Sequence, residues 1–327
     1  MTDFKSAKNR VIRFLFPVES DQWLAVLRVG LSIQLLAYCI SIKQDWNYFL
    51  ASTGGGILSR NFTEAVVDLN SPFIPRIGWG ITVGQYFGIS EQTTLIAIWW
   101  CLLTIAIFLL FGLFSRLAAV ISWLLHLATV KSSLLLSYGM DNLTTIGLFY
   151  LVLAPSPAAF SVDALWRRRN RQDRHLVGFF RRTLQLHLCL IYFFGGLNKA
   201  LGRGWWDGAN LWRALTRPPF DIISPDILIR FKYVYPIAGI GIWLLEIGYP
   251  FFMWQRQLRR PWLIAILVMH VGIGLAMGMY LFASVMIVLN LAAFGPGTLW
   301  PPGSKLVPVR RNFPLNRNVS LRPAAEK

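Results

Sequence analysis

Apolar residues are gathered along this chain in long, nearly unbroken runs separated by short polar segments. A helix that crosses a membrane needs about 20 consecutive, mostly apolar residues. The runs predict spans at 23–42, 93–113, 117–137, 183–198 and 234–254, a shorter and weaker span at 141–154, and two more within the apolar stretch 262–297, which is too long for one crossing. The pattern therefore predicts an all-α, polytopic integral membrane bundle of about eight transmembrane helices.

The segments outside the runs divide the chain further. Residues 1–22 include a basic, amphipathic stretch, KNRVIRFLF, and no small-residue cleavage site follows it, so we expect a retained first helix rather than a removed signal peptide. The mixed segment 43–92, with GGG at 54–56, predicts a long loop that could hold an interfacial helix. Residues 23–298 then form the transmembrane domain, and the basic, proline-containing residues 299–327 predict an irregular cytoplasmic tail.

Composition and charge support this topology. Only 14% of the 327 residues are charged and 55% are hydrophobic, whereas a soluble domain has about a quarter charged residues. The formal charge of +17 is an orientation signal, because Lys and Arg collect on cytoplasmic loops. With the N-terminus inside, most basic residues, including those of 166–182, fall in inner segments. We therefore expect both termini in the cytoplasm of a bacterial inner-membrane protein, with lipids rather than nucleic acid as partners.

Motifs of soluble enzymes and metal sites are absent from the sequence. Its three cysteines, Cys39, Cys101 and Cys189, lie inside apolar runs and form neither a disulfide framework nor a CxxC pattern. There is no G-x-S-x-G, P-loop or HExxH motif. Candidate chemistry must therefore come from polar residues within or beside the spans, and we expect no metal ligand set.

The stretch LNKALGRGWWDGANLW, at 197–212, places such residues directly after an apolar run. With the predicted topology, Lys199 lies at the outer end of its span. A plain interpretation is an interfacial anchor, in which Lys199 reaches the headgroups and Trp205 and Trp206 belong to an aromatic belt. The second interpretation is a binding site, because Asp207 adds an anion and Gly208 allows close backbone approach. The residues alone leave both open.

Ionisable residues inside the predicted spans favour the second interpretation. Glu246 lies near the middle of its span, where an ionised carboxylate must be protonated, paired or open to a wet cavity. His126 and His270 fall at a similar depth, although a single buried histidine is more often hydrogen-bonded within the bundle. Together with Asp141 and Asn142 at the outer start of the shortest span, these residues predict a polar pocket open to the outer leaflet.

Several pieces of the chain resemble a known family. LAVLRVGLS (24–32), YGMDNLTTIGL (138–148), FFGGLNKALGRGWWDGANL (193–211) and LLEIGYPFF with the later His270 are similar, in order and spacing, to the horizontally transferred transmembrane domain family. Its best-known members are the vitamin K-dependent γ-glutamyl carboxylases. In these, a lysine in a Gly-x-x-Lys stretch followed by Trp and Gly deprotonates reduced vitamin K. That pattern is matched by Gly196, Lys199, Trp205 or Trp206, and Gly208, and His270 matches a family histidine.

The resemblance also has two departures. Asn142 stands where a histidine of the family is expected, and the chain ends soon after its last predicted span. We therefore do not expect the large extramembrane domain with which the animal carboxylases engage their peptide substrate. Because a shared scaffold does not fix a reaction, peptide carboxylation is not implied.

The resulting functional hypothesis is an outer-facing lipophilic pocket for a quinone-like molecule or lipid, with a reduced quinone such as vitamin K hydroquinone as the implied cofactor. Whether it is catalytic is left open; a carboxylase-like lyase or quinol-dependent oxidoreductase would use Lys199 as general base, since apolar burial favours a neutral amine. His270 and Asn142 would orient the substrate. The substrate-binding residues would be Trp205, Trp206, Asp207, Gly208, Glu246, Asp141 and His126.

Two alternatives belong to other classes. The chain could be a non-catalytic factor that assembles or exports a peptide or membrane-protein partner, in which case replacing Lys199 would leave its function intact. It could also be a haem-b electron carrier with His126 and His270 as axial ligands, which would give the purified protein a Soret absorption band.

Overall fold

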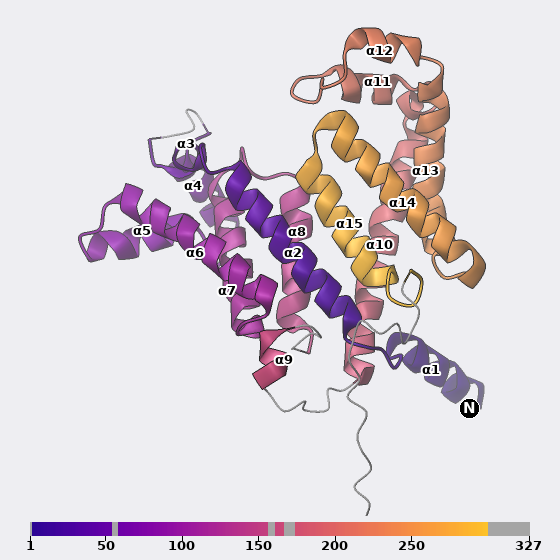
Figure 1. The fold of residues 1–327 in the computed structure, drawn as a ribbon, viewed down its shortest axis with the longest axis horizontal. Coiled ribbons are helices and arrows are strands. Elements are labelled where there is room, and N and C mark those ends of the chain that lie inside the picture. The colour runs from indigo at the N-terminus through magenta and orange to yellow at the C-terminus, as the bar shows by residue number, and fades with distance from the viewer. Residues whose placement is uncertain (1, 54–57, 156–160, 167–173, 300–327) are drawn as a thin grey trace, which may run out of the picture.

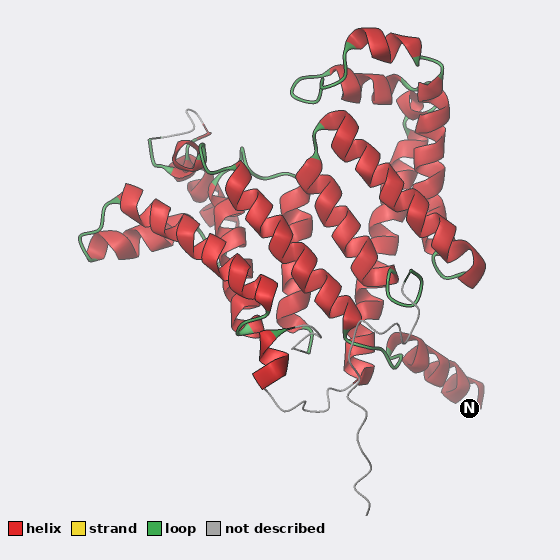
Figure 2. Ribbon diagram, in the orientation of Figure 1, coloured by secondary structure: helices red, strands yellow, loops and turns green. Residues whose placement is uncertain are grey.

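The computed structural model describes residues 2–53, 58–155, 161–166 and 174–299, and most of these residues lie in helices (Figure 1). Figure 2 shows helices joined by short loops, with no strand in the described residues. The all-α prediction is therefore confirmed. The predicted irregular tail lies outside the described residues, except for Leu299. The elements are α1 (Thr2–Leu15), α2 (Gln22–Ser41), α3 (Trp46–Leu50), α4 (Arg60–Asn70), α5 (Ile77–Tyr86), α6 (Glu91–Phe111), α7 (Ser115–Ser132), α8 (Gly139–Leu153), α9 (Val162–Trp166), α10 (Arg174–Leu201), the 3-10 turn η2 (Arg203–Trp205), α11 (Ala209–Thr216), α12 (Pro225–Arg230), α13 (Val234–Phe252), α14 (Arg256–Met277) and α15 (Tyr280–Phe294).

The apolar runs of the sequence all lie in helices: α2, α6, α7, α8, α10, α13, α14 and α15. Four of these, α2, α6, α13 and α14, are long and apolar enough to cross a membrane by length and composition. The helices α8 and α15 are apolar but shorter, at 15 residues each. The chain thus contains helices that resemble membrane spans. The number of crossings, eight, stays a prediction.

Helix α2 runs through the middle of the molecule and joins its two halves (Figure 1). On one side it packs against α6 and α8, both of which pack against α7. On the other side it packs against α15, which is followed outward by α14, α10 and α13. The most extensive of these contacts joins α10 to α13. This arrangement places the two helices that carry Lys199 and Glu246 side by side.

The apolar stretch 262–297 folds back on itself, as its basic flanks predict. Helix α14 ends at Gly278, whose backbone has a left-handed φ of 68° that a residue with a Cβ rarely adopts. Helix α15 begins two residues later and packs against α14. The bend therefore falls at the third glycine along the stretch, after Gly272 and Gly274.

The segment 43–92 is more ordered than the expected long loop, since it contains α3, α4 and α5. Ser59 caps α4 by accepting a hydrogen bond from the amide of Phe62. Arg60 then forms ion pairs with Glu64, at 3.2 Å, and with Glu91 at the start of α6, at 3.0 Å. Polar pairing of this kind holds short helices in a segment too polar for a span, and the sequence pattern alone did not resolve it.

Helix α10 is longer than its predicted span of 183–198, because it begins at Arg174 within the basic stretch. Its basic side chains have partners on other elements. Nη1 of Arg181 lies 2.6 Å from Oε2 of Glu19, and its Nε donates to the carbonyl of Ala293 at 3.0 Å. The guanidinium of Arg182 lies over the rings of Phe14 and Trp254. These contacts allow the helix to extend beyond the apolar run.

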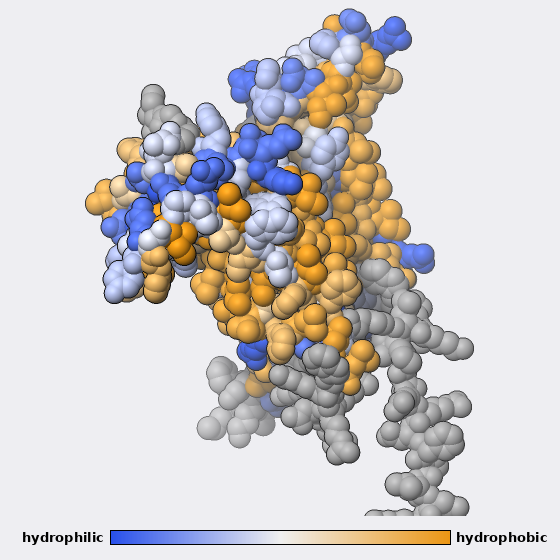
Figure 3. All heavy atoms as spheres, turned by 60° about the vertical axis from the view of Figure 1, so that its left-hand side comes forward, coloured by the Kyte–Doolittle hydropathy of each residue, from blue (hydrophilic) through white to orange (hydrophobic). Residues whose placement is uncertain are grey.

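The predicted inner and outer segments lie at opposite ends of the bundle. Helix α1, α9 and the start of α10 lie at one end, whereas α3, α4, α11 and α12 lie at the other (Figure 1). Between them, Figure 3 shows a broad hydrophobic surface, with hydrophilic side chains gathered towards the upper end. Many large apolar side chains on the long helices are exposed, among them Ile40, Phe194 and Ile237. Exposed apolar side chains on helices of this length and composition are typical of contact with lipid.

Candidate functional site

An ion pair joins α10 to α13. Nζ of Lys199 lies 2.7 Å from Oε2 of Glu246. The side chain of Glu246 is 10% exposed and that of Lys199 is 25% exposed, so the carboxylate is enclosed while the amine still reaches the surface. Of the three states that the sequence left open for Glu246, the structure has the paired one. Lys199 is its partner.

Two adjacent glycines of α10 allow this pair to form. A Cβ on Gly196 would lie 2.8 Å from the backbone nitrogen of Ile247 and from Cβ of Glu246, which is closer than real Cβ atoms approach. A Cβ on Gly195 would meet Oε2 of Glu246 at 3.4 Å. The two helices are therefore in direct backbone contact at the pair. Any larger residue at 196 would move α13 away from Lys199.

The tryptophans that follow α10 cover the pair on one side. Nζ of Lys199 lies 5.4 Å from the ring centroid of Trp205, within cation–π distance. The indole of Trp206 donates from Nε1 to the carbonyl of Ala200 at 2.7 Å and packs against Trp243, with 4.9 Å between ring centroids. Trp206 nevertheless remains about half exposed. The Trp205 indole thus brings flat apolar surface next to the amine, and Trp206 lies one residue further along the chain.

The turn after these tryptophans serves to position them. Gly208 has a left-handed φ of 79°, and a Cβ there would collide with the backbone of Tyr235 and Pro236 at the start of α13. Asp207 accepts a hydrogen bond from the amide of Ala209, the first residue of α11, at 2.9 Å. The expected approach of Asp207 to Lys199 is thus not what the contacts show. The carboxylate that reaches Lys199 belongs to Glu246.

A second polar group lies deeper between α10, α13, α14 and α15. Nε2 of His270 lies 2.7 Å from the hydroxyl of Tyr192, which accepts a hydrogen bond from Nδ2 of Asn290, also at 2.7 Å. Oδ1 of Asn290 accepts from the hydroxyl of Tyr249 at 2.7 Å. All four side chains are buried, and the rings of Tyr192 and Tyr249 stack at 4.2 Å. The result is a hydrogen-bonded chain that ends at His270.

The ion pair and this chain are neighbours. Glu246 is within electrostatic reach of Tyr192, and Lys199 is within electrostatic reach of His270. Among the residues that the structure describes, Nδ1 of His270 has no hydrogen-bond partner although the side chain is 3% exposed. Within the described residues, the site therefore combines an ion pair, the ring of Trp205 and one buried ring nitrogen without a hydrogen-bond partner.

A comparison with protein families identifies the family to which these helices belong. The HTTM domain model matches residues 82–296, which cover Lys199, Glu246, His270 and all the helices that hold them. The chain belongs to the HTTM family. No curated protein and no solved structure matches it. The resemblance inferred from sequence motifs is thereby confirmed, and together with the apolar helices it makes the chain a membrane protein of this family.

Three residues expected in the same pocket lie elsewhere in the HTTM fold. Asn142 is exposed on α8, and none of the described contacts joins it to Lys199. Asp141 is buried at the start of α8, where Oδ2 accepts from the amide of Tyr138 at 3.1 Å. His126 is fully buried on α7, with its ring edge-on to Tyr38 of α2. These three belong to the α2, α7 and α8 side of the bundle.

Asp141, His126 and Tyr38 form a separate buried cluster. The carboxylate of Asp141 is within electrostatic reach of the Tyr38 hydroxyl, and the backbone of Asp141 faces the His126 ring. Within the described ranges, both ring nitrogens of His126, the Tyr38 hydroxyl and Oδ1 of Asp141 have no hydrogen-bond partner. His126 and His270 are thus enclosed by different residues on different halves of the HTTM fold, which does not favour a shared haem.

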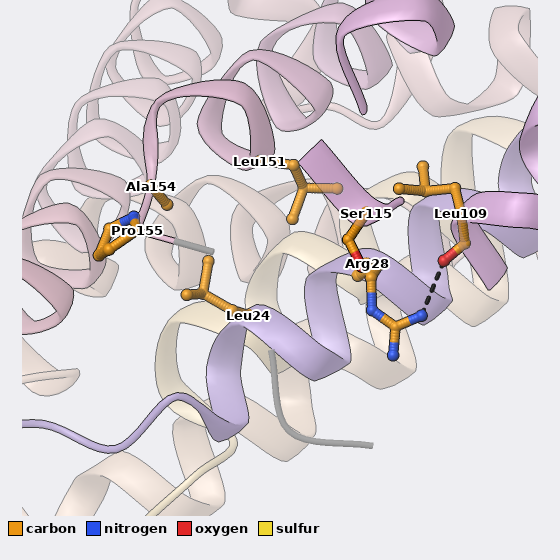
Figure 4. A pocket seen from close by; sticks show the side chains of 7 residues that line it. All are labelled: Leu24, Arg28, Leu109, Ser115, Leu151, Ala154 and Pro155. Carbon is orange, nitrogen blue, oxygen red and sulfur yellow. Dashed lines mark hydrogen bonds between the residues drawn. The ribbon is translucent and has the colours of Figure 1, made fainter. Parts of the chain in front are cut away.

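Neither of two cavities within the described residues is lined by Lys199. One is an open polar cleft of about 490 Å³ around Arg60, Glu64 and Glu91. The other is a cavity of about 20 Å³ beside Arg28 and Ser115, whose apolar walls come from α2, α6 and α8 (Figure 4). The smaller one has room for about one water molecule. The lipophilic pocket expected at Lys199 therefore remains a proposal that rests on side-chain chemistry.

The sequence analysis missed three members of the site: Tyr192, Tyr249 and Asn290. Helical spacing offered a signal for two of them. Tyr192 precedes Lys199 by seven residues and Tyr249 follows Glu246 by three, so each lies on the same helix face as its charged neighbour. Asn290, an amide in the middle of an apolar run, offered the third signal, because a polar side chain inside a membrane helix usually marks an internal partner.

Proposed function

We propose that this HTTM protein binds a flat, lipophilic molecule with an acidic hydroxyl, of the reduced-quinone type, beside Lys199 and removes the hydroxyl proton. The observation that carries the proposal is the 2.7 Å contact between Lys199 and Glu246, enclosed at the junction of α10 and α13. A surface anchor needs only a cation at the headgroups. It does not need a buried carboxylate as partner or a pair of glycines to admit one.

The pair can hold its shared proton in two ways. It can be an ammonium with a carboxylate, or an amine with a carboxylic acid, and the net charge of the pair is zero in both cases. An apolar environment disfavours separated charges, so burial moves the balance towards the neutral form. In that form the lone pair of Nζ accepts the hydroxyl proton of the substrate. The substrate becomes an oxyanion and Lys199 becomes an ammonium.

The tryptophans support both parts of this proposal. The face of Trp205 attracts the ammonium that forms when Nζ takes up a proton. The half-exposed indole of Trp206 offers a surface on which an aromatic ring of the substrate could stack from the lipid side. A reduced quinone such as vitamin K hydroquinone, which the family resemblance implies, has both the flat ring and the hydroxyl. The proposed reaction stops at the deprotonated quinol and includes no peptide carboxylation.

The test uses the purified protein in lipid nanodiscs under anaerobic conditions, with 1,4-naphthoquinol as the probe. Deprotonation of the bound quinol shifts its ultraviolet absorption to longer wavelength, so the anion is observed directly. We expect the anion with the natural protein and its loss in Lys199→Arg, because arginine stays protonated in proteins. Binding without any anion spectrum, or an unchanged anion spectrum in Lys199→Arg, would refute the base.

The two alternatives make different predictions. A factor that only assembles or exports a partner keeps its effect in cells when Lys199 is replaced by alanine, whereas the proposed enzyme loses it. A haem carrier needs His126 and His270 near one iron, and the structure places them against Tyr38 and Tyr192, respectively. A Soret band in the purified protein would nevertheless establish the carrier directly.

A further inference from the structure

The amide of Asn290 has only one sensible orientation. Nδ2 lies 2.8 Å from the backbone carbonyl of Met286, and a carbonyl oxygen can only accept hydrogen bonds. The NH2 group must therefore face Met286, because the reversed amide would place two acceptor oxygens against each other. Oδ1 then faces the Tyr249 hydroxyl, which can donate to it. The backbone of α15 thus fixes the direction of the whole hydrogen-bonded chain.

This direction determines which atom carries the proton at His270. The second N–H of the Asn290 amide donates to the hydroxyl oxygen of Tyr192. With its oxygen accepting from the amide, Tyr192 donates its own proton to Nε2 of His270. A ring nitrogen that accepts a hydrogen bond carries no proton, so the proton of the neutral imidazole lies on Nδ1. The alternative tautomer would point two donors at Tyr192 and leave its hydroxyl proton without an acceptor.

We infer that Tyr192 and Asn290 are positioning residues that hold His270 as its Nδ1–H tautomer and so present a buried N–H donor to an acceptor oxygen of the bound molecule. No protein acceptor in the described residues satisfies Nδ1. A buried donor without an acceptor is costly, so a ligand oxygen placed there gains the full hydrogen bond. The inference rests on the proposed function for the identity of that oxygen, which is the oxyanion produced when Lys199 takes the proton.

Nitrogen-15 solid-state NMR tests the tautomer without any substrate. The chain has four histidines, and the His270 signals are assigned by difference from a His270→Gln variant, all in lipid bilayers. We expect a protonated Nδ1 and an unprotonated Nε2. In Asn290→Leu, where the Tyr192 oxygen becomes free to accept from Nε2–H, the tautomer ratio should change on the order of ten-fold, the effect of one hydrogen bond. Tyr192→Phe should change it similarly.

The matched control is Tyr249→Phe, which removes a hydroxyl from the same chain but leaves Asn290 oriented by Met286. Its tautomer ratio should equal that of the natural protein. A protonated Nε2 in the natural protein, or equal ratios in Asn290→Leu and Tyr249→Phe, would overturn the inference. Adding 1,4-naphthoquinone, which has acceptor oxygens, should move the Nδ1 signal, whereas naphthalene should not; equal responses to both would overturn the oxygen contact.

These outcomes are separable from those of the proposed function. If the Lys199 base is wrong, Lys199→Arg leaves the naphthoquinol anion unchanged while the His270 tautomer is still Nδ1–H. If the hydrogen-bonded chain from Asn290 through Tyr192 does not set the tautomer of His270, the natural protein will not show the Nδ1–H form, whatever the quinol assay shows. Tautomer and quinol deprotonation are measured on different atoms, so neither result can stand in for the other.

Discussion

Gly196→Ala is the sharpest test of how the ion pair is held. The added Cβ would lie 2.8 Å from the backbone nitrogen of Ile247, whereas nonbonded heavy atoms prefer about 3.5–4.0 Å. Helices α10 and α13 must therefore separate by roughly 1 Å. The same displacement at the pair stretches the 2.7 Å contact between Lys199 and Glu246 beyond the hydrogen-bond range. The added methyl group should thus break the ion pair between Lys199 and Glu246, although neither of these residues is changed.

The expected stability change follows from two opposing effects. Overpacking costs about 1–3 kcal/mol, and replacing a glycine inside a helix returns about 0.5–1 kcal/mol. We expect a net loss of roughly 0.5–2 kcal/mol, seen as a fall of a few degrees in the thermal unfolding temperature of the purified protein. The naphthoquinol anion should be lost as well, because the acid–base pair is separated.

Gly241→Ala on α13 is the matched control. A Cβ at this position has no atom within 4 Å, so the variant should unfold at the same temperature as the natural protein or slightly above it and keep the quinol anion. If Gly196→Ala and Gly241→Ala behave alike in both assays, α10 and α13 do not approach as closely as described. The pair would then have to be held by other contacts.

Three further predictions address charge and topology. Lys199→Arg should lose function in a cellular complementation assay as completely as Lys199→Ala, although both variants insert and fold; a functional arginine variant would make the stretch an interfacial anchor. Glu246→Leu should impair folding or function more than Glu246→Gln, by up to about 3 kcal/mol in unfolding free energy, because leucine leaves the amine unpaired; equal, negligible effects would show that the pair is dispensable. Cysteines introduced in 203–230 should react with an impermeant thiol reagent in intact cells and those in 174–182 should not, and the reverse pattern would place Lys199 on the cytoplasmic side.

Much of the fold was predictable because lipid imposes simple constraints on length and hydrophobicity. Every apolar run became a helix, and the turn within 262–297 followed from the basic residues at both of its ends. The helices of 43–92 were less visible, since they depend on pairs such as Arg60 with Glu91 that are far apart in sequence. The start of α10 within the basic stretch was missed for the same reason. It depends on pairs such as Arg181 with Glu19, which are also far apart in sequence.

The sequence predicts how deep each site residue lies in its span, but not towards which neighbouring helix its side chain points. Counting along a span locates a residue along the membrane normal, so Glu246, His126 and His270 could be placed at similar depth. It does not tell which neighbour the residue faces around the helix axis, so it could not show that His126 and Asn142 lie on other helices away from Lys199. The partner of Lys199 was identifiable as a candidate because membrane carboxylates are seldom unpaired. The hydrogen-bonded chain through Tyr192 and Asn290 depends on contacts between four helices. Contacts of this kind leave no local pattern in a single sequence.

Arg28 has a consequence for the way the chain is made. This buried arginine in α2 donates from Nη1 to the carbonyls of Leu109, at 2.7 Å, and Leu110, at 2.6 Å, at the end of α6. Those acceptors lie 81 and 82 residues further along the chain and leave the ribosome later. Until they arrive, a charged side chain in the first apolar helix is unfavourable in the lipid core and favours a position near the interface. The first apolar helix to be synthesised is thus among the last to settle, and its final depth is fixed by a segment translated after it.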